Sequence, residues 1–236
     1  MRISAPIYKL KRQAKMMSRE RGIALNEALD MIARKSGFRS WSHLAFAARS
    51  DPVPRILREL RAGEMLLLGA RPGQGKTLLA LELAFAAARS GRRSYFFTLE
   101  YTEADVRSRL ASLGLGEAGS ELALVIDTSD DICAGHVIDR LRDEPRPAFV
   151  VIDYLQLLDQ KRSKPELGGQ LAMLGAYARS SGSIMVLISQ IDRVFELDDR
   201  RMPELVDVRL PNTADLKLFA KACFLHEGEL ELASVA

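Results

Sequence analysis

A short glycine-containing segment between an apolar run and a helix-forming segment constrains the fold of this chain more than any other feature. It reads Ala70-Arg71-Pro72-Gly73-Gln74-Gly75-Lys76-Thr77 and follows the apolar residues 65–69. Small residues let backbone N–H groups converge on one anion, and the helix that follows directs its positive end at the same point. The segment therefore predicts a phosphate-binding loop between a buried strand and a helix. A glycine-rich turn of chance composition is the alternative.

Two residues at the end of this loop carry side chains suited to a triphosphate. Lys76 can pair with the β- and γ-phosphates, and the hydroxyl of Thr77 can bind Mg²⁺. Alanine stands at position 70, where the strict motif begins with glycine, and this is tolerable if that backbone position does not need a positive φ. The expected nucleotide-binding residues are Ala70, Arg71, Pro72, Gly73, Gln74, Gly75, Lys76 and Thr77.

Short runs rich in β-branched and aromatic residues alternate with segments of helical periodicity from residue 64 onward. This alternation predicts an α/β fold with a mostly parallel sheet flanked by helices. The expected strands are 65–69, 94–99, 122–127, 149–153, 184–190 and 218–225. The expected helices between them are 77–90, 103–113, 132–142 and about 167–179.

Three of the expected strands end in, or are directly followed by, a polar residue that suits phosphate chemistry. Asp153 ends an apolar strand at the edge where the phosphate loop lies, so it can hold Mg²⁺. Glu100 can orient or deprotonate an attacking water, and Gln190 can contact a γ-phosphate. Each residue also has a structural alternative: a carboxylate at a turn for Asp153, a helix cap for Glu100 and a turn amide for Gln190.

The first 50 residues are far more basic than the rest of the chain. They carry eleven basic and three acidic side chains, whereas the whole chain has a net charge of +3. This surplus favours an acidic partner such as nucleic acid, and a solvated face on a small helical module is equally compatible with it.

Helical periodicity in this basic segment predicts three helices, the first from about Ile7 to Arg21. Ser36-Gly37 separates the other two, and Ser40 can cap the last one. We expect Trp41 to pack in the core of this module, with stacking on bases as the alternative. The prolines at 52 and 54 are expected to end the last helix, so the chain is divided into a helical module (1–50) and an α/β domain (51–236).

Composition excludes two other classes of protein. A hydrophobic content of 47% is too high for intrinsic disorder. No uncharged run exceeds 12 residues, and about 20 are needed to cross a membrane, so no membrane association is expected. The N-terminus lacks the apolar core of a secretory signal, and a cytoplasmic location is expected.

Four segments together resemble the ATPase domain of DnaB-type replicative helicases, within the RecA-like superfamily. They are Gly69-Ala70-Arg71-Pro72, Leu99-Glu100, Ile152-Asp153-Tyr154-Leu155-Gln156-Leu157 and Ser189-Gln190-Ile191-Asp192-Arg193. Residues 201–209 and 214–216 resemble the last part of that family, so the resemblance extends from about residue 57 to 225.

The resemblance implies a RecA-like core that hydrolyses ATP. By it, Lys76, Glu100 and Gln190 are the catalytic residues, and Thr77 and Asp153 hold Mg²⁺. It also implies single-stranded DNA as a partner and a homo-oligomer, which in that family is a hexamer. DNA contact would use two loops of the sheet edge, with Lys161, Arg162 and Lys164 in the first and Arg193, Arg200 and Arg201 in the second.

The chain also departs from this family in two ways. A basic segment of about 50 residues stands where the family has a larger N-terminal domain. In family hexamers a basic residue from the neighbouring subunit completes each active site, but no Lys or Arg follows Lys221 here. Because such a residue can contribute about 10³–10⁵ in rate, slow hydrolysis is expected.

Two functions are therefore compatible with the sequence. The first is an ATP-driven helicase or translocase of the DnaB-like type. The second is a nucleotide-switched regulatory or DNA-binding module without motor activity, which the missing basic residue favours. Acidic neighbours at 196, 198 and 199 offset the charge of the second loop, so solvated loop charge is an alternative to DNA contact. A small-molecule kinase has no acceptor-site motif to favour it.

Overall fold

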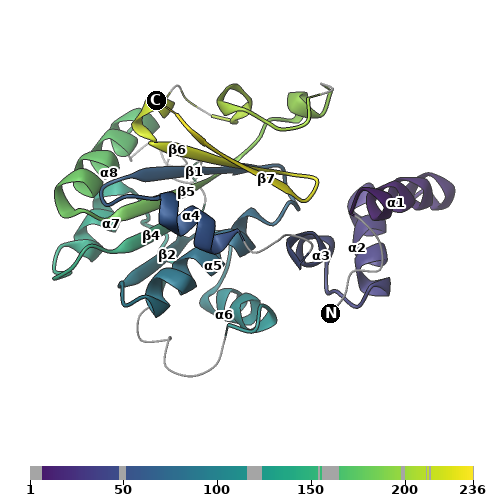
Figure 1. Cartoon of the computed structure of the whole chain (residues 1–236), viewed down its shortest axis with the longest axis horizontal. Coiled ribbons are helices and arrows are strands. Elements are labelled where there is room, and N and C mark those ends of the chain that lie inside the picture. The colour runs from purple at the N-terminus through teal and green to yellow at the C-terminus, as the bar shows by residue number, and fades with distance from the viewer. Residues whose placement is uncertain are drawn as a thin grey trace.

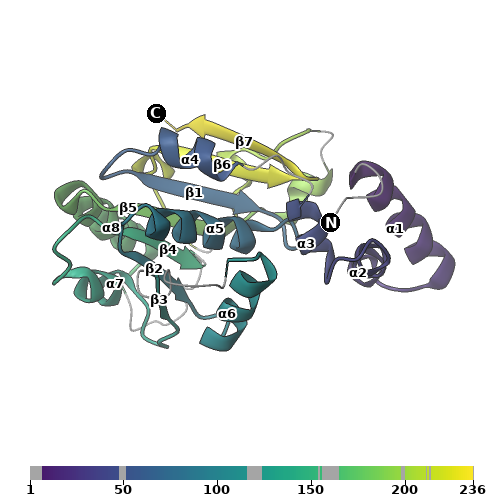
Figure 2. The ribbon, with the colours of Figure 1, turned by 60° about the horizontal axis from the view of Figure 1, so that its bottom comes forward.

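The computed structural model describes residues 7–47, 52–115, 124–153, 155, 165–197, 200–210, 212 and 214–235. In this part of the chain a seven-stranded sheet has the order β3-β2-β4-β5-β1-β6-β7 (Figures 1 and 2). The strands are β1 (Met65–Ala70), β2 (Ser94–Thr98), β3 (Leu124–Asp127), β4 (Phe149–Asp153), β5 (Ile184–Gln190), β6 (Lys221–His226) and β7 (Glu229–Ser234). All neighbouring strands are parallel except the antiparallel pair β6 and β7. The expected mostly parallel sheet with flanking helices is confirmed.

Helices cover both faces of this sheet. The helices of the α/β region are α4 (Val53–Glu59), α5 (Lys76–Arg89), α6 (Glu103–Ser112), α7 (Ala134–Leu141) and α8 (Leu167–Ser181). Alternate residues of each strand face opposite sides, as the pleat of a strand requires. On β1, Leu66 and Leu68 pack with α4, α5 and α6, whereas Met65 and Leu67 pack with α7 and α8. The strands β1, β2, β4 and β5 are buried on both faces, which explains their continuous apolar runs.

The N-terminal helices α1 (Ile7–Arg21), α2 (Leu25–Lys35) and α3 (Trp41–Ala47) form a separate helical module at one end of the sheet (Figures 1 and 2). Its buried side chains, Trp41 and Leu44 among them, pack on one another in their own hydrophobic cluster. Ser40 caps α3, because its Oγ accepts a hydrogen bond from the backbone N–H of His43 at 3.2 Å. Trp41 is 5% exposed, so it packs in the core of the module as expected.

Two elements of the structure differ from the sequence-based expectation. Helix α4 was not expected, and Pro52 and Pro54 lie at its start, since proline fits the first turn of a helix, where no N–H partner is needed. Strand β7 was not expected, and it pairs with β6 through a tight turn in which Glu227 (φ 49°) and Gly228 (φ 88°) are left-handed. Residues 48–51 lie outside the described residues, so the division at residue 50 stays a prediction.

The last expected strand begins later than expected, at Lys221. The residues before it form a 3₁₀ turn, Leu216–Leu218, in which Asp215 accepts a hydrogen bond from the backbone N–H of Lys217. Two other 3₁₀ turns, Arg193–Leu197 and Leu205–Asp207, follow β5. No helix in the described part of the chain has the length and apolar character needed to span a bilayer.

Candidate nucleotide site

The phosphate loop leaves the carboxyl end of β1, which is buried along its whole length. Gly73 has φ +79° and Gly75 has φ +84°, values that favour glycine because they are costly for any residue with a Cβ. Ala70 is not left-handed: among the described residues other than glycine, positive φ occurs at Glu227 alone. Alanine is therefore tolerated at the first position of the motif, as anticipated.

Helix α5 begins directly after the loop, at Lys76. The carbonyl of Gly75 accepts the first helical hydrogen bond, from the N–H of Leu79 at 3.1 Å. The N–H groups of the first turn of a helix have no partner within the helix, so they are available to an anion. Lys76 is 9% exposed and Thr77 8% exposed, which places both side chains at the protected base of this anion site.

Neighbouring elements hold the loop in place. The Arg71 guanidinium donates to the carbonyl of Ile191 at 2.9 Å and forms an ion pair with Glu196 at 3.2 Å. Gln74 accepts a hydrogen bond through Oε1 from the backbone N–H of Glu227 at 3.0 Å. These two side chains therefore fix the backbone of the loop, and direct contact of either one with a nucleotide stays a prediction.

Asp153 lies at the carboxyl end of β4 and is 1% exposed. Neither of its carboxylate oxygens has a hydrogen-bond partner among the residues that the structure describes. Burial raises the pKa of Asp153 to about 7, and the nearby charge of Glu100 also raises it, whereas the charge of Lys76 lowers it. The hydroxyl of Thr77 also lowers this pKa, although it forms no hydrogen bond of normal geometry with the carboxylate. A buried carboxylate without partners is costly, so this position suits a cation.

The donor set at this position fits Mg²⁺. The carboxylate of Asp153 and the hydroxyl of Thr77 supply hard oxygen atoms, which Mg²⁺ prefers. Within the described residues, no group of three or more His, Cys, Asp or Glu side chains could enclose a metal ion. Few protein ligands are expected for Mg²⁺, because this ion usually keeps several waters and binds phosphate oxygens.

The two other predicted catalytic residues lie at the same edge of the sheet. Glu100 follows β2, and its backbone N–H donates to Oγ1 of Thr98 at 3.1 Å. Its side chain is exposed, and its charge acts on Asp153. Gln190 ends β5 directly opposite Ala70, the first residue of the loop. The sheet thus brings Glu100, Gln190 and Asp153 together around the phosphate loop.

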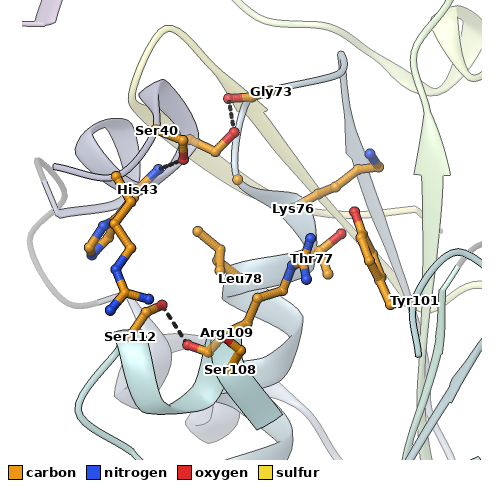
Figure 3. Close-up of a pocket in the computed structure, with 13 residues that line it drawn as sticks. Ser40, His43, Gly73, Lys76, Thr77, Leu78, Tyr101, Ser108, Arg109 and Ser112 are labelled. Carbon is orange, nitrogen blue, oxygen red and sulfur yellow. Dashed lines mark hydrogen bonds between the residues drawn. The ribbon is translucent and has the colours of Figure 1, made fainter. Parts of the chain in front are cut away.

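A pocket that was not expected from the sequence lies beside the loop, and the helical module helps to form it (Figure 3). Tyr101 and Arg109 line it from the side of α6, with the guanidinium carbon of Arg109 at 3.8 Å from the centre of the Tyr101 ring. Ser40, His43 and other residues of the module line the opposite side. The proximity of Tyr101 could have been inferred from its place after Glu100, but no pattern in the sequence indicates where the module docks.

The predicted DNA-binding residues have different environments. Arg193 is exposed in the 3₁₀ turn after β5. Arg200 donates to both carboxylate oxygens of Asp207, at 2.9 and 2.6 Å, and Arg201 donates to both of Glu229, at 2.7 Å each. The first predicted loop, with Lys161, Arg162 and Lys164, lies outside the described residues.

A strand, a glycine loop and a helix that place Lys76 and Thr77 beside the buried carboxylate of Asp153 define a P-loop ATPase domain of RecA-like fold. A family model described as an AAA domain matches residues 32–189. The match covers more than half of the 236 residues, and the chain belongs to this family.

Curated relatives are similar over the same region. DNA repair protein RadA of Brucella abortus (strain 2308) is 30% identical over 192 residues, which are 74% of this chain and 40% of the relative. RadA of Mycobacterium tuberculosis (strain CDC 1551 / Oshkosh) is 27% identical, over 70% of this chain and 36% of the relative. A probable plasmid replicative DNA helicase of Chlamydia trachomatis is 26% identical, over 68% and 43%. The chain thus spans less than half the length of these relatives.

Solved structures show the same fold at lower identity. One of them, a solved ATPase domain, has a TM-score of 0.63 at 18% identity and covers 75% of each chain. A DnaB-like replicative helicase, solved in a study of its interactions with primase, has a TM-score of 0.58 at 14% identity, over 92% of this chain and 64% of that one. These matches confirm the RecA-like fold that the resemblance implied.

Proposed function

We propose that this chain binds ATP with Mg²⁺, hydrolyses ATP and acts on DNA as a helicase or translocase of the DnaB-like type. The observation that carries the proposal is the position of Asp153. Its buried carboxylate has no hydrogen-bond partner in the described part of the chain and lies near Lys76 and Thr77 at the phosphate loop. A buried polar group without a hydrogen bond costs free energy, and such a group is typical of a site that is completed by a ligand.

Each residue of the site has one role in this proposal. The N–H groups of the loop and of the first turn of α5 bind the phosphates, and Lys76 adds its positive charge. Glu100 orients the attacking water and accepts its proton, and Gln190 contacts the γ-phosphate from the tip of β5. Because most of these groups follow rigid strands, they hold the substrate with little reorganisation.

Thr77 and Asp153 would hold Mg²⁺, which when bound supplies positive charge against the charge that develops on the phosphates. The ion would also provide the partner that the Asp153 carboxylate lacks. Asp153 therefore serves two purposes in this proposal, since it anchors the ion and gains stabilisation from it.

The DNA-associated part of the proposal depends on charge and on the relatives. The exposed side chains of α1 include Arg12, Lys15, Arg19 and Arg21, which suit a polyanion. Two of the relatives are a DNA repair protein and a probable plasmid replicative DNA helicase. We propose single-stranded DNA as the partner, with Arg193 and the predicted loop residues Lys161, Arg162 and Lys164 in contact with it, and a homo-oligomer such as a hexamer as the working form.

A nucleotide-switched module without motor activity is the second candidate. The ion pairs of Arg200 with Asp207 and of Arg201 with Glu229 favour it, because these two arginines are engaged within the chain itself. Neutralised arginines contribute little to tracking phosphates along a strand. In this case nucleotide occupancy would control contact with a partner.

The two candidates are separated by the ATPase rate, measured against protein concentration with and without single-stranded DNA. A motor that works as an oligomer is expected to show stimulation by DNA and a rate per chain that rises above a threshold concentration. A low rate that neither DNA nor concentration changes would overturn the motor and favour the switch.

Nucleotide binding itself is tested by Lys76→Ala, with Lys217→Ala as the control. Both substitutions remove one lysine, but Lys217 is exposed on the 3₁₀ turn before β6. We expect calorimetry with a non-hydrolysable ATP analogue and Mg²⁺ to detect no binding by Lys76→Ala and unchanged affinity in Lys217→Ala. Equal affinities in the two variants would contradict the proposed site.

A further inference from the structure

The pocket beside the phosphate loop is built by parts of the chain that are distant in sequence. It has a volume of about 280 Å³. One wall consists of the phosphate loop, the start of α5 and one side of α6, and the helical module forms the other with Arg39, Ser40, Ser42 and His43. Figure 3 shows His43 and Ser40 on the side opposite Lys76, Thr77 and Tyr101.

The charge of this pocket has one sign. Its described lining residues include three cations, Arg39, Lys76 and Arg109, and no carboxylate. Burial lowers the pKa of His43, and the charge of Arg39 lowers it further, so His43 contributes a neutral ring at neutral pH. A small pocket with three cations and an adjoining phosphate loop suits a highly charged anion, and one of the three cations comes from the module.

Hydrogen bonds and an ion pair hold the helical module against the phosphate loop and the turn beside it. The Ser42 hydroxyl donates a hydrogen bond to the carbonyl of Gly73 at 3.0 Å. On α1, Lys11 forms an ion pair with Glu227 at 2.5 Å, and the backbone N–H of that same Glu227 donates to Gln74 of the loop. The module therefore contacts the loop directly through Ser42 and indirectly through the turn between β6 and β7.

We propose that the helical module completes the nucleotide pocket of its own chain, with Arg39 binding the phosphates of a nucleoside triphosphate together with Lys76. This inference rests on the proposed function, because it requires that the loop binds a nucleotide. The family match begins at residue 32 and so includes Arg39 and α3 with the ATPase core.

The contacts described between the module and the loop region are polar, and a ligand bound between the two walls would strengthen the docking of the module. Among the side chains that the structure describes, the hydrophobic cluster of α1 to α3 contains none of the α/β region, and the two clusters of that region contain none from the module. The polar contacts of Ser42 and Lys11 hold the module against the α/β region, and a ligand that touches both walls adds to them. A nucleotide that binds both walls stabilises the docked arrangement, and by linkage a better docked module binds the nucleotide more tightly.

The first test compares Arg39→Gln with Arg34→Gln. Both arginines are exposed residues of the module, but Arg34 does not line the pocket. We expect calorimetry with a non-hydrolysable ATP analogue and Mg²⁺ to give about 5- to 30-fold weaker binding for Arg39→Gln and wild-type affinity for Arg34→Gln.

The binding of the analogue by wild type and by the two variants tests the role of Arg39 separately from the proposed function. If wild type binds the analogue and Arg39→Gln binds it as well as Arg34→Gln does, the role of Arg39 is overturned while the proposed function stands. If the wild-type chain binds no analogue, the proposed function fails and the inference fails with it.

The second test alters docking without touching the pocket. Lys11→Glu and Glu227→Lys each place like charges at the contact between α1 and the turn after β6. Neither residue lines the pocket. We expect each single substitution to weaken nucleotide binding about 2- to 5-fold and the double substitution to restore it. Affinity that is unchanged in both single variants would overturn the coupling between docking and nucleotide binding.

Discussion

Thr98 and Asp153 lie directly opposite each other in the parallel pair of β2 and β4. Asp153 is the last residue of its strand, and Glu100 follows Thr98 by two residues. The register of two buried strands therefore sets the distance between a proposed metal ligand and a proposed catalytic carboxylate. Because both strands are buried, a slip of this register would expose their apolar residues, so the geometry of the site is tied to the stability of the sheet.

Replacing Glu100 by Gln is expected to separate binding from hydrolysis. The amide keeps the shape of the side chain but cannot accept a proton, and a general base contributes about 10²–10⁴ in rate. The ATPase rate should fall by that order, while affinity for the nucleotide stays near that of wild type.

The matched control is Glu103→Gln, an exposed carboxylate at the start of α6 that pairs with Arg107. This variant should keep the wild-type rate. Wild-type turnover in Glu100→Gln, measured with the same preparation, would remove Glu100 from the proposed mechanism.

Replacing Asp153 by Asn is expected to stabilise the protein without Mg²⁺ and to weaken its response to the ion. The neutral side chain removes a buried, unpartnered charge at pH 8, above the raised pKa of about 7. We expect the free energy of unfolding in EDTA to rise by about 1 kcal/mol or more.

Addition of Mg²⁺ and ATP should then stabilise Asp153→Asn less than it stabilises wild type. Thermal unfolding in EDTA and in Mg²⁺ with ATP measures both effects. A variant that is less stable than wild type in EDTA would show that the ionised carboxylate has a partner in the folded chain.

The phosphate loop and the edge of the sheet could be predicted because their signals are local. Buried parallel strands have continuous apolar runs, and Gly73 and Gly75 mark the left-handed positions of the loop. Once parallel strands are inferred, residues such as Asp153 and Gln190 must meet at the same edge, because all carboxyl ends lie there. The predicted grouping of site residues followed from topology and required no knowledge of side-chain contacts.

The position at which the helical module packs against the α/β region could not be predicted, because this contact leaves no periodic pattern in the sequence. It involves polar contacts such as that of Ser42 with Gly73, between residues 31 positions apart. Strand β7 had a weak signal in the alternation of Glu229 to Leu232, but its turn uses a left-handed Glu227 in place of the usual Asn or Gly. The position of the module and the formation of β7 are therefore both set by tertiary contacts, because the local sequence preference is weak in the first case and opposes the turn in the second.

Substitution of Gly69 by Ala is expected to destabilise the fold next to the loop. A Cβ at this position would lie 2.7 Å from Cε1 of Phe224 and 3.1 Å from Cδ1 of Ile191. The buried ring of Phe224 would have to move, and overpacking of this kind costs about 1–3 kcal/mol.

The control is Gly169→Ala, in the first turn of α8, where the added methyl group meets nothing within 4 Å. There we expect a gain of about 0.5–1 kcal/mol, because alanine favours the helix. Urea unfolding measures the expected loss of stability in Gly69→Ala and the expected gain in Gly169→Ala. Equal stabilities of the two variants would show that the Phe224 ring moves aside without cost.

The ion pair of Arg200 with Asp207 predicts a pH dependence of stability. Burial alone would raise the pKa of Asp207, but hydrogen bonds from Arg200 and from the N–H of Glu204, with the charge of Arg200, hold it below its ordinary value of 3.8. The stabilisation is therefore present above pH 3.8 and is lost as the pH falls through the lower pKa of the folded chain. We expect Asp207→Asn to lose about 1–3 kcal/mol at pH 7 and less near pH 3, because wild type has by then lost part of the same interaction.

The control for this prediction is Asp139→Asn, which breaks an ion pair with Arg142 in which both side chains are exposed. Exposed pairs contribute about 0–1 kcal/mol, so this variant should unfold nearly as wild type does at both pH values. Urea unfolding at pH 7 and near pH 3 gives the comparison. If Asp207→Asn lost the same free energy at both values, the pair with Arg200 would be excluded as the source of the effect, because only an ionised Asp207 attracts the guanidinium.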